Sequence, residues 1–334
     1  MSRYQPPLTI TPAILDWVGQ IGETLGRWSF VTETELSPQL RRGNRIRTIQ
    51  ASLAIENNTL SLEQVTAVLD GKRVLGLPRE IQEVRNAFAA YEHLPRWQPT
   101  AIKDLLAAHG LLMAGLLDDA GHFRAGGVGI YRGDALMHMA PPASRVPTLM
   151  QDLLAWLASG ALHPLVASCV FHYEFEFIHP FADGNGRLGR LWQTLILSRW
   201  KPLLAYLPVE TVVRDRQDAY YQALADADRS ADAAPFVAFM LQALHTAMAE
   251  TALTDPVSDP VSDPVKQLLA AFQSDEALKT GELLNRLGLK HRPSFRKTYL
   301  QPALAGGWIE MTQPQSPNSP AQKYRLTAKG RRLR

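Results

Sequence analysis

The spacing of hydrophobic residues along this chain is mainly that of amphipathic helices. Apolar positions recur at intervals of three and four residues, as they do on the buried face of a helix. In the first such segment, Leu15, Val18, Ile21 and Leu25 share one face. The same pattern predicts helices over residues 38–57, 61–71, 79–118, 146–157, 164–178 and 235–244, and a central one that begins near residue 185.

A different pattern lies in the middle of the chain. Glycines are scattered from Gly121 to Gly133, and the short segment 135–139 and two prolines follow. Scattered glycines can form a phosphate-binding loop, but no Walker motif is present. The segment therefore predicts a β-hairpin rich in turns.

Residues 254–265 repeat a four-residue unit of Asp, Pro, Val and Ser, which marks a domain boundary. Because proline removes an amide donor and blocks helix, the repeat predicts a semi-extended linker. Helices predicted over 266–272, 280–288 and 293–305, followed by strands over 308–311 and 323–326, have the layout of a winged helix. We divide the chain into an N-terminal helical region (1–100), a core (101–253), the linker (254–265) and a winged-helix domain (266–334).

Charge is distributed unevenly between these parts. The net charge is +3, yet residues 265–334 hold 13 Lys and Arg against 4 Asp and Glu, which is +9 and leaves −6 for the rest. Arg292, Arg296 and Lys297 would line the third helix of the predicted winged helix. Many winged helices bind DNA with that face, and many others dock proteins or dimerise. DNA and a protein both stay open as partners of this domain.

The composition indicates a globular protein of the cytoplasm. Hydrophobic residues make up 46% and charged residues 20% of the chain, an ordinary balance. Cys169 is the single cysteine, which excludes an intrachain disulfide and fits a reducing compartment. No signal segment is recognisable, and no stretch is long and apolar enough to cross a bilayer. We therefore expect a cytoplasmic protein with no membrane partner.

Residues 179–190, His-Pro-Phe-Ala-Asp-Gly-Asn-Gly-Arg-Leu-Gly-Arg, concentrate the chemistry of the chain. The turn 184–186 stands where a helix begins, because Leu188, Leu191, Trp192 and Leu195 follow it as one buried stripe. Free N–H groups and the helix dipole favour an anion at such a start, and glycines let the anion approach closely.

Charged residues complete this candidate site. Arg187 and Arg190 are three residues apart on the helix, so their forked donors suit a polyphosphate. Asp183 offers a hard oxygen ligand for Mg²⁺ between phosphates. His179 can act as a base near neutral pH. We expect the ring of Phe181 to be buried and to anchor the loop.

These residues resemble the signature of the Fic family, H-x-F-x-[D/E]-G-N-G-R-x-x-R, and match it at every specified position. Enzymes of that family typically transfer AMP from ATP to a hydroxyl side chain of a target protein. The related Doc branch, which phosphorylates, departs from the signature at its second glycine. Gly186 is retained here, which favours nucleotidyl transfer.

The resemblance implies a mainly α-helical Fic-type core, in which the β-hairpin is a flap that binds a target segment by strand pairing. It implies ATP, Mg²⁺ and a target protein with a Tyr, Thr or Ser hydroxyl. His179 would be the catalytic base, Asp183 the metal ligand, and Asn185 would steady the α-phosphate. The residues that it implies for nucleotide binding are Glu56, Asp183, Gly184, Asn185, Gly186, Arg187, Leu188, Gly189, Arg190 and Tyr221. The chain departs from many relatives at Asp228, where they carry an asparagine.

A second resemblance lies upstream of the core. Residues 52–57, Ser-Leu-Ala-Ile-Glu-Asn, are similar to the inhibitory helix motif of Fic proteins, [S/T]-x-x-x-E-[G/N]. In that arrangement Glu56 reaches into the nucleotide site and pairs with Arg190, which the ATP γ-phosphate would otherwise bind. ATP would then bind in an unreactive pose.

The sequence thus predicts a nucleotidyltransferase, a protein adenylyltransferase inhibited by Glu56. Two alternatives stay open. One is a de-AMPylase in which Glu56 orients a water molecule. The other is a DNA-binding regulator with a nucleotide-sensing core, which the charge of +9 in the C-terminal part suggests. A homodimer is a further expectation.

Overall fold

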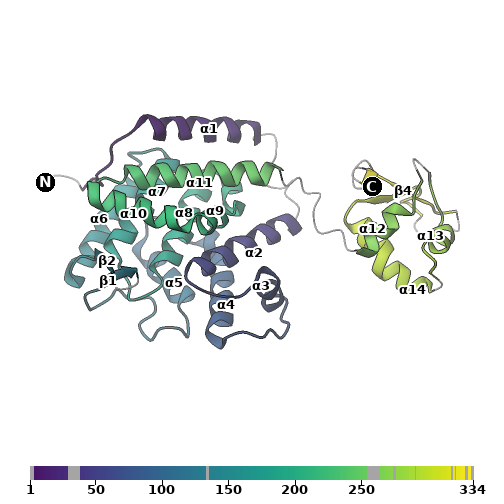
Figure 1. Ribbon diagram of the computed structural model, residues 1–334, viewed down its shortest axis with the longest axis horizontal. Coiled ribbons are helices and arrows are strands. Elements are labelled where there is room, and N and C mark those ends of the chain that lie inside the picture. Colours follow the sequence, from purple (N-terminus) through teal and green to yellow (C-terminus); the bar gives the residue numbers. More distant parts are fainter. Residues whose placement is uncertain are drawn as a thin grey trace. The chain divides into compact units, whose positions relative to one another are not determined.

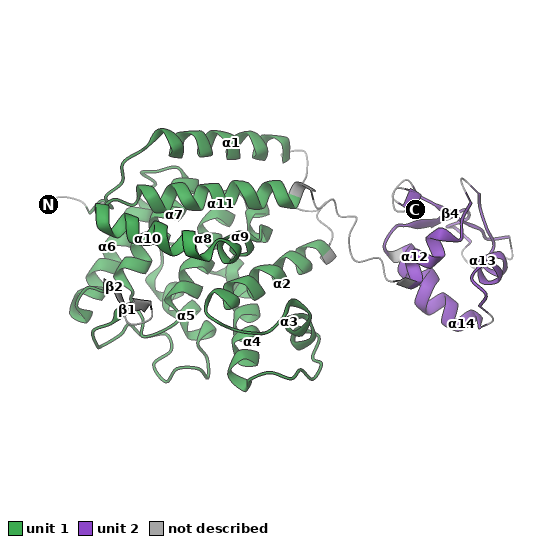
Figure 2. Cartoon of the chain, in the orientation of Figure 1, with its two compact units in different colours: residues 1–253 green, residues 254–334 purple. Residues whose placement is uncertain are grey.

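The computed structural model (Figure 1) describes residues 4–28, 38–132, 135–253, 263–273, 276–289, 291–316, 319, 321–327 and 330–331. The chain divides into two compact units, residues 1–253 and 254–334 (Figure 2). Residues 254–262 of the predicted linker lie outside the described residues. The linker was predicted to extend to residue 265, but helix α12 already begins at Asp263.

The first unit is mainly helical, as predicted. No helix among the described residues combines the length and the apolar character that a bilayer span requires. Short 3₁₀ turns lie at Leu94–Arg96, Ala143–Arg145 and Pro202–Tyr206. The α-helices are α1 (Pro12–Trp28), α2 (Pro38–Ile55), α3 (Leu62–Leu69), α4 (Pro78–His93), α5 (Ile102–Leu112), α6 (Val146–Ala158), α7 (Pro164–Ile178), α8 (Asn185–Trp200), α9 (Val209–Asp215), α10 (Gln217–Ser230) and α11 (Ala234–Leu253).

The single helical segment predicted over residues 79–118 is wrong. Helix α4 ends at His93, and a 3₁₀ turn that contains Pro95 follows. Proline has no N–H to continue the helical ladder, so the chain leaves the helix there and α5 starts only at Ile102. The connection is fixed to the core, because the indole N–H of Trp192 in α8 donates to the Pro99 carbonyl at 2.9 Å.

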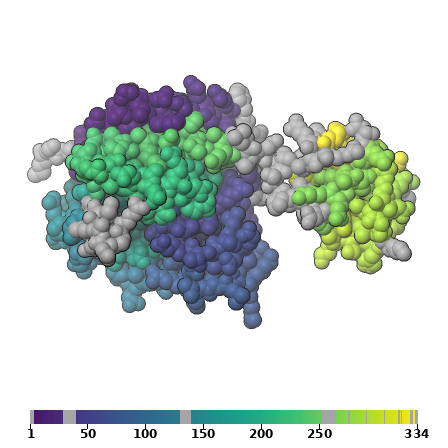
Figure 3. Space-filling model, in the orientation of Figure 1, coloured from purple at the N-terminus to yellow at the C-terminus, as the bar shows by residue number. Residues whose placement is uncertain are grey.

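Helices α7 and α8 pack against each other at the centre of the unit. The stripe predicted on α8 is buried completely, at Leu188, Leu191, Trp192 and Leu195. Helix α11 packs on α7 and α10, and α1 covers α11 from outside; Figure 3 shows α1 (purple) along the green surface of α11. The two central helices are therefore held rigidly, and the loop between them has a fixed base.

The predicted β-hairpin is confirmed. Strands β1 (Gly129–Arg132) and β2 (Ala135–Met139) pair antiparallel, with Gly129 opposite Met139. The register shifts between Ile130 and Tyr131, which is the mark of a β-bulge. In the described part of the chain each strand has one partner, so the hairpin keeps an unpaired edge on either side.

The second unit has the predicted order of elements, helices followed by a hairpin. Strands β3 (Ile309–Met311) and β4 (Tyr324–Leu326) pair antiparallel, and Leu278 pairs with Tyr324 on its other side through two hydrogen bonds of 2.8 Å. A separate core contains Phe272, Phe295 and Trp308. The helical segments are α12 (Asp263–Ala270), α13 (Thr280–Arg286), α14 (Arg292–Phe295), a wider π-helical turn (Arg296–Leu300) and α15 (Gln301–Ala305).

Candidate active site

Residues 179–184 form a tight loop, the motif loop, between α7 and α8. His179 follows α7 with a left-handed backbone (φ 49°), and its N–H donates to the Phe175 carbonyl at 2.9 Å. Gly184 is also left-handed (φ 82°), and α8 begins directly after it. Left-handed backbone is unfavourable for a residue with a β-carbon, so the surroundings must hold His179 in this conformation. The helix start predicted from the glycines is confirmed.

The side chain of Asn185 holds the motif loop closed. Its Nδ2 donates to the Phe181 carbonyl at 2.9 Å, and its Oδ1 accepts from the Phe181 N–H at 3.0 Å. The Phe181 ring is buried, as predicted, and stacks on His109 with ring centroids 3.7 Å apart. Asn185 is buried and uses both polar side-chain atoms on the loop. Its side chain therefore braces the loop, and the prediction that Asn185 steadies the α-phosphate stays a prediction, which its backbone N–H at the helix start could serve.

His109 of α5 supports the motif loop from the side, a role that the sequence analysis missed. Its Nδ1 accepts from the Gly121 N–H at 2.9 Å, so the ring proton lies on Nε2. Nε2 then donates to the Asp183 carbonyl at 3.0 Å. Burial lowers the pKa of His109, which keeps the ring neutral in this position.

Arg124 was also missed, and it joins the motif loop to the hairpin. Its buried guanidinium donates to the carbonyls of His179 at 2.7 Å, Gly126 at 2.7 Å and Pro141 at 2.6 Å. Gly126 and Pro141 flank the two strands in sequence. A single arginine in a glycine-rich segment gives no sequence signal for such a role, because its acceptors are backbone atoms and the one in the motif loop is 55 positions away.

The Arg190 guanidinium is held by the end of α2. Its Nε and Nη2 donate to the hydroxyl and the carbonyl of Ser52, each at 3.0 Å. Nη2 also donates to Glu56 Oε1 at 2.8 Å, and the exposed fractions of the two side chains are 3% for Arg190 and 32% for Glu56. Burial is the largest single influence and would lower the pKa of Arg190, but the charge and hydrogen bond of Glu56 together with nearby Tyr220 and Glu176 raise it. The contact expected between Glu56 and Arg190 is thus present.

Gly186 packs against this ion pair. A β-carbon at Gly186 would collide with Glu56 Oε1 and would lie 3.0 Å from Arg190 Nη1. The Glu56 carboxylate therefore lies over the first turn of α8, where free N–H groups and the helix dipole favour an anion. The anion at this helix start is thus a side-chain carboxylate.

Arg187 has different neighbours from Arg190. Its guanidinium donates to Glu83 Oε1 at 3.3 Å and to Asp183 Oδ1 at 3.1 Å. Arg79 of α4 donates to the other Asp183 oxygen at 3.2 Å. Glu83 and Arg79 were missed by the sequence analysis, since they lie more than one hundred positions away in the chain. Asp183 is balanced by two guanidinium groups.

Asp183 is the candidate metal ligand. Mg²⁺ is commonly held by one or two carboxylates together with substrate phosphates, and the Asp183 side chain is 41% exposed at the rim of the site. No group of three or more His, Cys, Asp or Glu residues suited to a metal occurs among the described residues. The residues present fit a magnesium ion that is shared with a nucleotide, not one held by protein ligands alone.

Two ionisable side chains lie beneath the site on α7. Burial raises the pKa of Glu176 to about 7, with Arg190 opposing and Glu56 reinforcing the shift. Burial lowers the pKa of His172 to about 3, so this ring is neutral. Tyr220 of α10 packs against them, and its hydroxyl lies 3.2 Å from His172 Nε2.

Leu188, Gly189 and Tyr221, which were expected to bind the nucleotide, do not face a common surface. Leu188 is fully buried, and its N–H donates within the helix to the Gly184 carbonyl at 3.0 Å. A β-carbon on Gly189 would meet Glu176 Oε1 at 3.0 Å, so this position faces α7. The Leu188 side chain and the Gly189 position thus face the interior, and their part in nucleotide binding stays a prediction. Tyr221 is half-buried against Tyr220, with ring centroids 5.3 Å apart.

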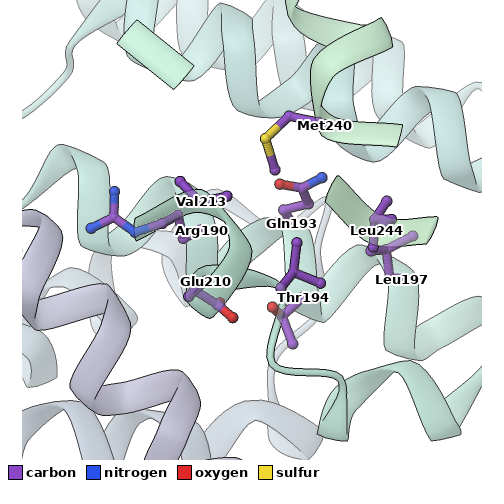
Figure 4. A pocket seen from close by; sticks show the side chains of 9 residues that line it. Arg190, Gln193, Thr194, Leu197, Glu210, Val213, Met240 and Leu244 are labelled. Atoms are coloured by element: carbon purple, nitrogen blue, oxygen red, sulfur yellow. The ribbon is translucent and has the colours of Figure 1, made fainter. Parts of the chain in front are cut away.

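The inner side of α8 has no room for a nucleotide. The cavity there measures about 10 Å³ and is lined by side chains of α8, α9 and α11. Figure 4 shows the Arg190 guanidinium pointing away from this cavity and toward α2. A ligand of Arg190 must therefore approach from the side on which Glu56 lies.

Comparisons with known proteins agree with this geometry. The Fic/DOC family matches residues 99–197, and the family described as "Filamentation induced by cAMP protein Fic-like, C-terminal domain" matches residues 263–327. A crystal structure of a Fic family protein from Desulfovibrio desulfuricans G20 is 65% identical, with a TM-score of 0.75, over 97% of this chain and 99% of that one. The chain belongs to the Fic family.

Other members are more distant. Fic-1 from C. elegans shares the fold, with a TM-score of 0.60 and 23% identity over 72% of either chain. "Protein adenylyltransferase Fic" is 30% identical over 226 residues in Drosophila mojavensis and 29% identical over 210 residues in Nematostella vectensis. These alignments take in 62% and 58% of this Fic chain. The chain spans less than half the length of these curated relatives, 41% and 45% respectively.

Proposed function

We propose that this Fic protein is a protein adenylyltransferase, which transfers AMP from ATP to a Tyr, Thr or Ser hydroxyl of a target protein. The observation that carries the proposal is the Glu56 carboxylate bound 2.8 Å from Arg190 over the start of α8. A buried guanidinium beside a helix N-terminus is an anion site, and phosphate fits it as carboxylate does. The activity in the names of the curated relatives supports the same conclusion.

In the proposed reaction the ATP phosphates lie along the turn 184–187. His179 Nε2 accepts the proton of the target hydroxyl, whose oxygen bonds to the α-phosphorus. The bond from that phosphorus to the oxygen bridging to the β-phosphate breaks, so pyrophosphate leaves and AMP stays on the target. Arg187 and Arg190 stabilise the charge on the leaving group. Mg²⁺ held by Asp183 would neutralise part of the phosphate charge.

We propose that Glu56 inhibits this reaction. Nη2 of Arg190 is not available to a phosphate of ATP while it donates to Glu56 Oε1 at 2.8 Å. Nε and Nη2 of Arg190 also donate to Ser52, so the guanidinium cannot swing away without breaking several hydrogen bonds. ATP must displace Glu56 to bind productively.

To test this function, the full chain is incubated with labelled ATP and the label incorporated into protein is measured. ATP labelled at the α-phosphate should label a target in cell lysate, most strongly with Glu56→Gly protein. ATP labelled at the γ-phosphate should not, which separates AMP transfer from phosphorylation. The double variant Glu56→Gly/His179→Ala is the matched control. Equal labelling by this control would contradict the role of His179, and no α-label with any variant would contradict the function.

Removal of AMP is the alternative within the same site. The Glu56 carboxylate is 32% exposed, so a water molecule can reach it while it is bound to Arg190. An AMP-modified target incubated with wild-type and Glu56→Gly proteins distinguishes the two directions. Faster release of AMP by the wild-type protein would favour de-AMPylation, and release that does not depend on Glu56 would favour transfer as the main activity.

For the second unit we propose a winged-helix domain that binds DNA. Arg292, Arg296 and Lys297 are exposed on its third helical segment. Two acids described in this unit pair with other arginines, Glu276 with Arg286 and Glu310 with Arg325. Glu282 accepts from the Lys279 N–H and lines the same surface pocket as Arg292 and Arg296. Three exposed cations on one helical segment suit DNA phosphates.

DNA binding is tested with the full chain and a labelled random-sequence duplex. Three phosphate contacts should make the affinity fall with salt at a log–log slope of roughly −3. Arg292→Gln/Arg296→Gln/Lys297→Gln should abolish that slope, while the charge-matched variant Lys72→Gln/Arg73→Gln/Lys103→Gln in the first unit should keep it. Equal loss in both variants would contradict a DNA site on this helix. A homodimer and a cytoplasmic location stay predictions from the sequence.

A further inference from the structure

Glu176 lies on the last turn of α7, three residues before His179, and faces one nitrogen of its ring. His179 Nδ1 is 3.4 Å from the Glu176 carbonyl oxygen and 4.0 Å from Glu176 Oε2. With two acceptors on that side, the ring proton is best placed on Nδ1. Nε2 is then the nitrogen with a lone pair, as a general base requires.

The other carboxyl oxygen of Glu176 is buried without a donor among the described residues. His172 Nε2 is 3.8 Å away, but it can accept from the Tyr220 hydroxyl at 3.2 Å, and its Nδ1 faces Gln193 Oε1 at 2.8 Å. Gly189 adds no donor on the facing side of α8, where even a β-carbon would lie 3.0 Å from this oxygen. Because Oε1 has no donor, burial destabilises the ionised form of Glu176. The stability of that form then depends on which group Oε2 can bind.

The charged and titratable groups around Glu176 come from each neighbouring element. Arg190 of α8 favours its ionised form, whereas Glu56, after α2, disfavours it. His172 and His179 face it on its own side of the site, and Tyr220 and Tyr221 of α10 lie within electrostatic range. Burial is the largest influence and raises the pKa of Glu176 to about 7. With Glu56 in place, the carboxyl group therefore holds a proton over much of the neutral range.

We propose that Glu176 is a positioning residue for His179, which holds the imidazole by Nδ1 and stabilises the imidazolium formed when Nε2 takes the target proton. The inference rests on the proposed function. A shift of about 1 Å brings Oε2 from 4.0 Å to hydrogen-bond distance of Nδ1. An ionised carboxylate there favours the protonated ring, as an opposite charge at 4 to 6 Å generally does.

The same arrangement links Glu176 to the inhibitory contact. When Glu56 leaves Arg190 in the nucleotide-free protein, one negative charge near Glu176 is removed and the positive charge of Arg190 remains. Glu176 then loses its proton at a lower pH. In the nucleotide-free protein, release of Glu56 therefore favours the ionised carboxylate that holds His179 Nδ1.

NMR titration of the full chain with isotope-labelled histidine tests this inference without relying on activity. The His179 signal is assigned by its loss in His179→Ala. In the Glu56→Gly background, Glu176→Gln should lower the pKa of His179 by about 1, and Glu176→Asp should restore part of the difference. Glu92→Gln, an exposed acid on α4, is the control and should leave it unchanged. A His179 pKa that is the same in Glu176→Gln and its parent would overturn the inference.

A kinetic readout separates this inference from the proposed function. If AMP transfer occurs, Glu176→Gln should lower kcat and move its low-pH limb, with little change in the KM for ATP. An unchanged pH profile at unchanged kcat would count against the positioning role. If Glu56→Gly protein transfers no AMP at all, the proposed function fails, and the NMR titration still decides the role of Glu176.

Discussion

Replacement of Glu56 tests the proposed inhibition most directly. Glu56 contributes one charge-assisted hydrogen bond, 2.8 Å long, to a guanidinium that is only 3% exposed. Such bonds contribute about 1.5–3 kcal/mol. Because the Glu56 side chain is 32% exposed, solvent screens the interaction and the lower part of that range, about 1.5–2 kcal/mol, applies.

This free energy sets the size of the activation. If the closed state with Glu56 on Arg190 is favoured by about 1.5–2 kcal/mol, only roughly 3–8% of the molecules have a free anion site. Glu56→Gly should therefore raise the rate of AMP transfer at low ATP by roughly 10- to 30-fold. The same change should lower Tm by about 3–8 °C, because the buried Arg190 loses a partner.

The assay measures α-labelled AMP on the protein itself and on lysate proteins, at several ATP concentrations. Glu56→Gln keeps the side-chain shape and loses the charge, so its rate should lie between wild type and Glu56→Gly. Glu92→Gln controls for a changed net charge and should behave as wild type. ATP should raise the Tm of Glu56→Gly more than that of wild type. A Glu56→Gly protein that is destabilised but no faster would refute inhibition by this contact.

Three further predictions concern residues around the same loop. His179→Ala in the Glu56→Gly background should lower AMP transfer by at least about 100-fold, with Tm nearly unchanged, which label incorporation and thermal unfolding check together. Arg124→Met removes the donor of three short hydrogen bonds to carbonyls, so it should cost about 3 kcal/mol and lower Tm by about 6–12 °C; an unchanged Tm would contradict the bracing role. The pKa of Glu176 rises from 4.5 to about 7 on folding, so the folded protein retains this proton longer and loses stability as the pH rises through that window. Glu176→Gln should therefore match wild type in urea unfolding at pH 4 and exceed it by up to about 3 kcal/mol at pH 8, whereas equal differences at both pH values would contradict the buried position of this carboxyl group.

The local sequence pattern predicted the structure correctly where the contacts that determine it are close in sequence. The helical stripe at Leu188, Leu191, Trp192 and Leu195 follows from periodicity, and all four residues are buried. The glycine-rich hairpin followed from turn chemistry. The prediction of one long helix over 79–118 was wrong because the hydrophobic period continues across Pro95. The period does not show that proline lacks the N–H that a continuous helix needs.

Within the motif, matching a family signature did not reveal which way each side chain faces. The side chain of Leu188 belongs to the buried stripe that its periodicity predicts. Asn185 looks like a ligand-binding amide in sequence, yet it closes the loop on Phe181, four residues away. A signature gives the residue types that are required. The structure shows which of their side chains contact the loop itself.

The sequence by itself determined the helical class, the hairpin, the glycine-containing turn at the start of α8, and the acid and the arginine that meet across it. Only the tertiary structure decided that Ser52 accepts hydrogen bonds from Arg190 and that Arg124 links the motif loop to the hairpin. It also decided that Glu83 pairs with Arg187 and that Arg79 pairs with Asp183. The physical reason is distance along the chain. Helical period and turn chemistry act over a few residues, whereas these partners are 55 to 138 positions apart and are brought together by the packing of whole helices.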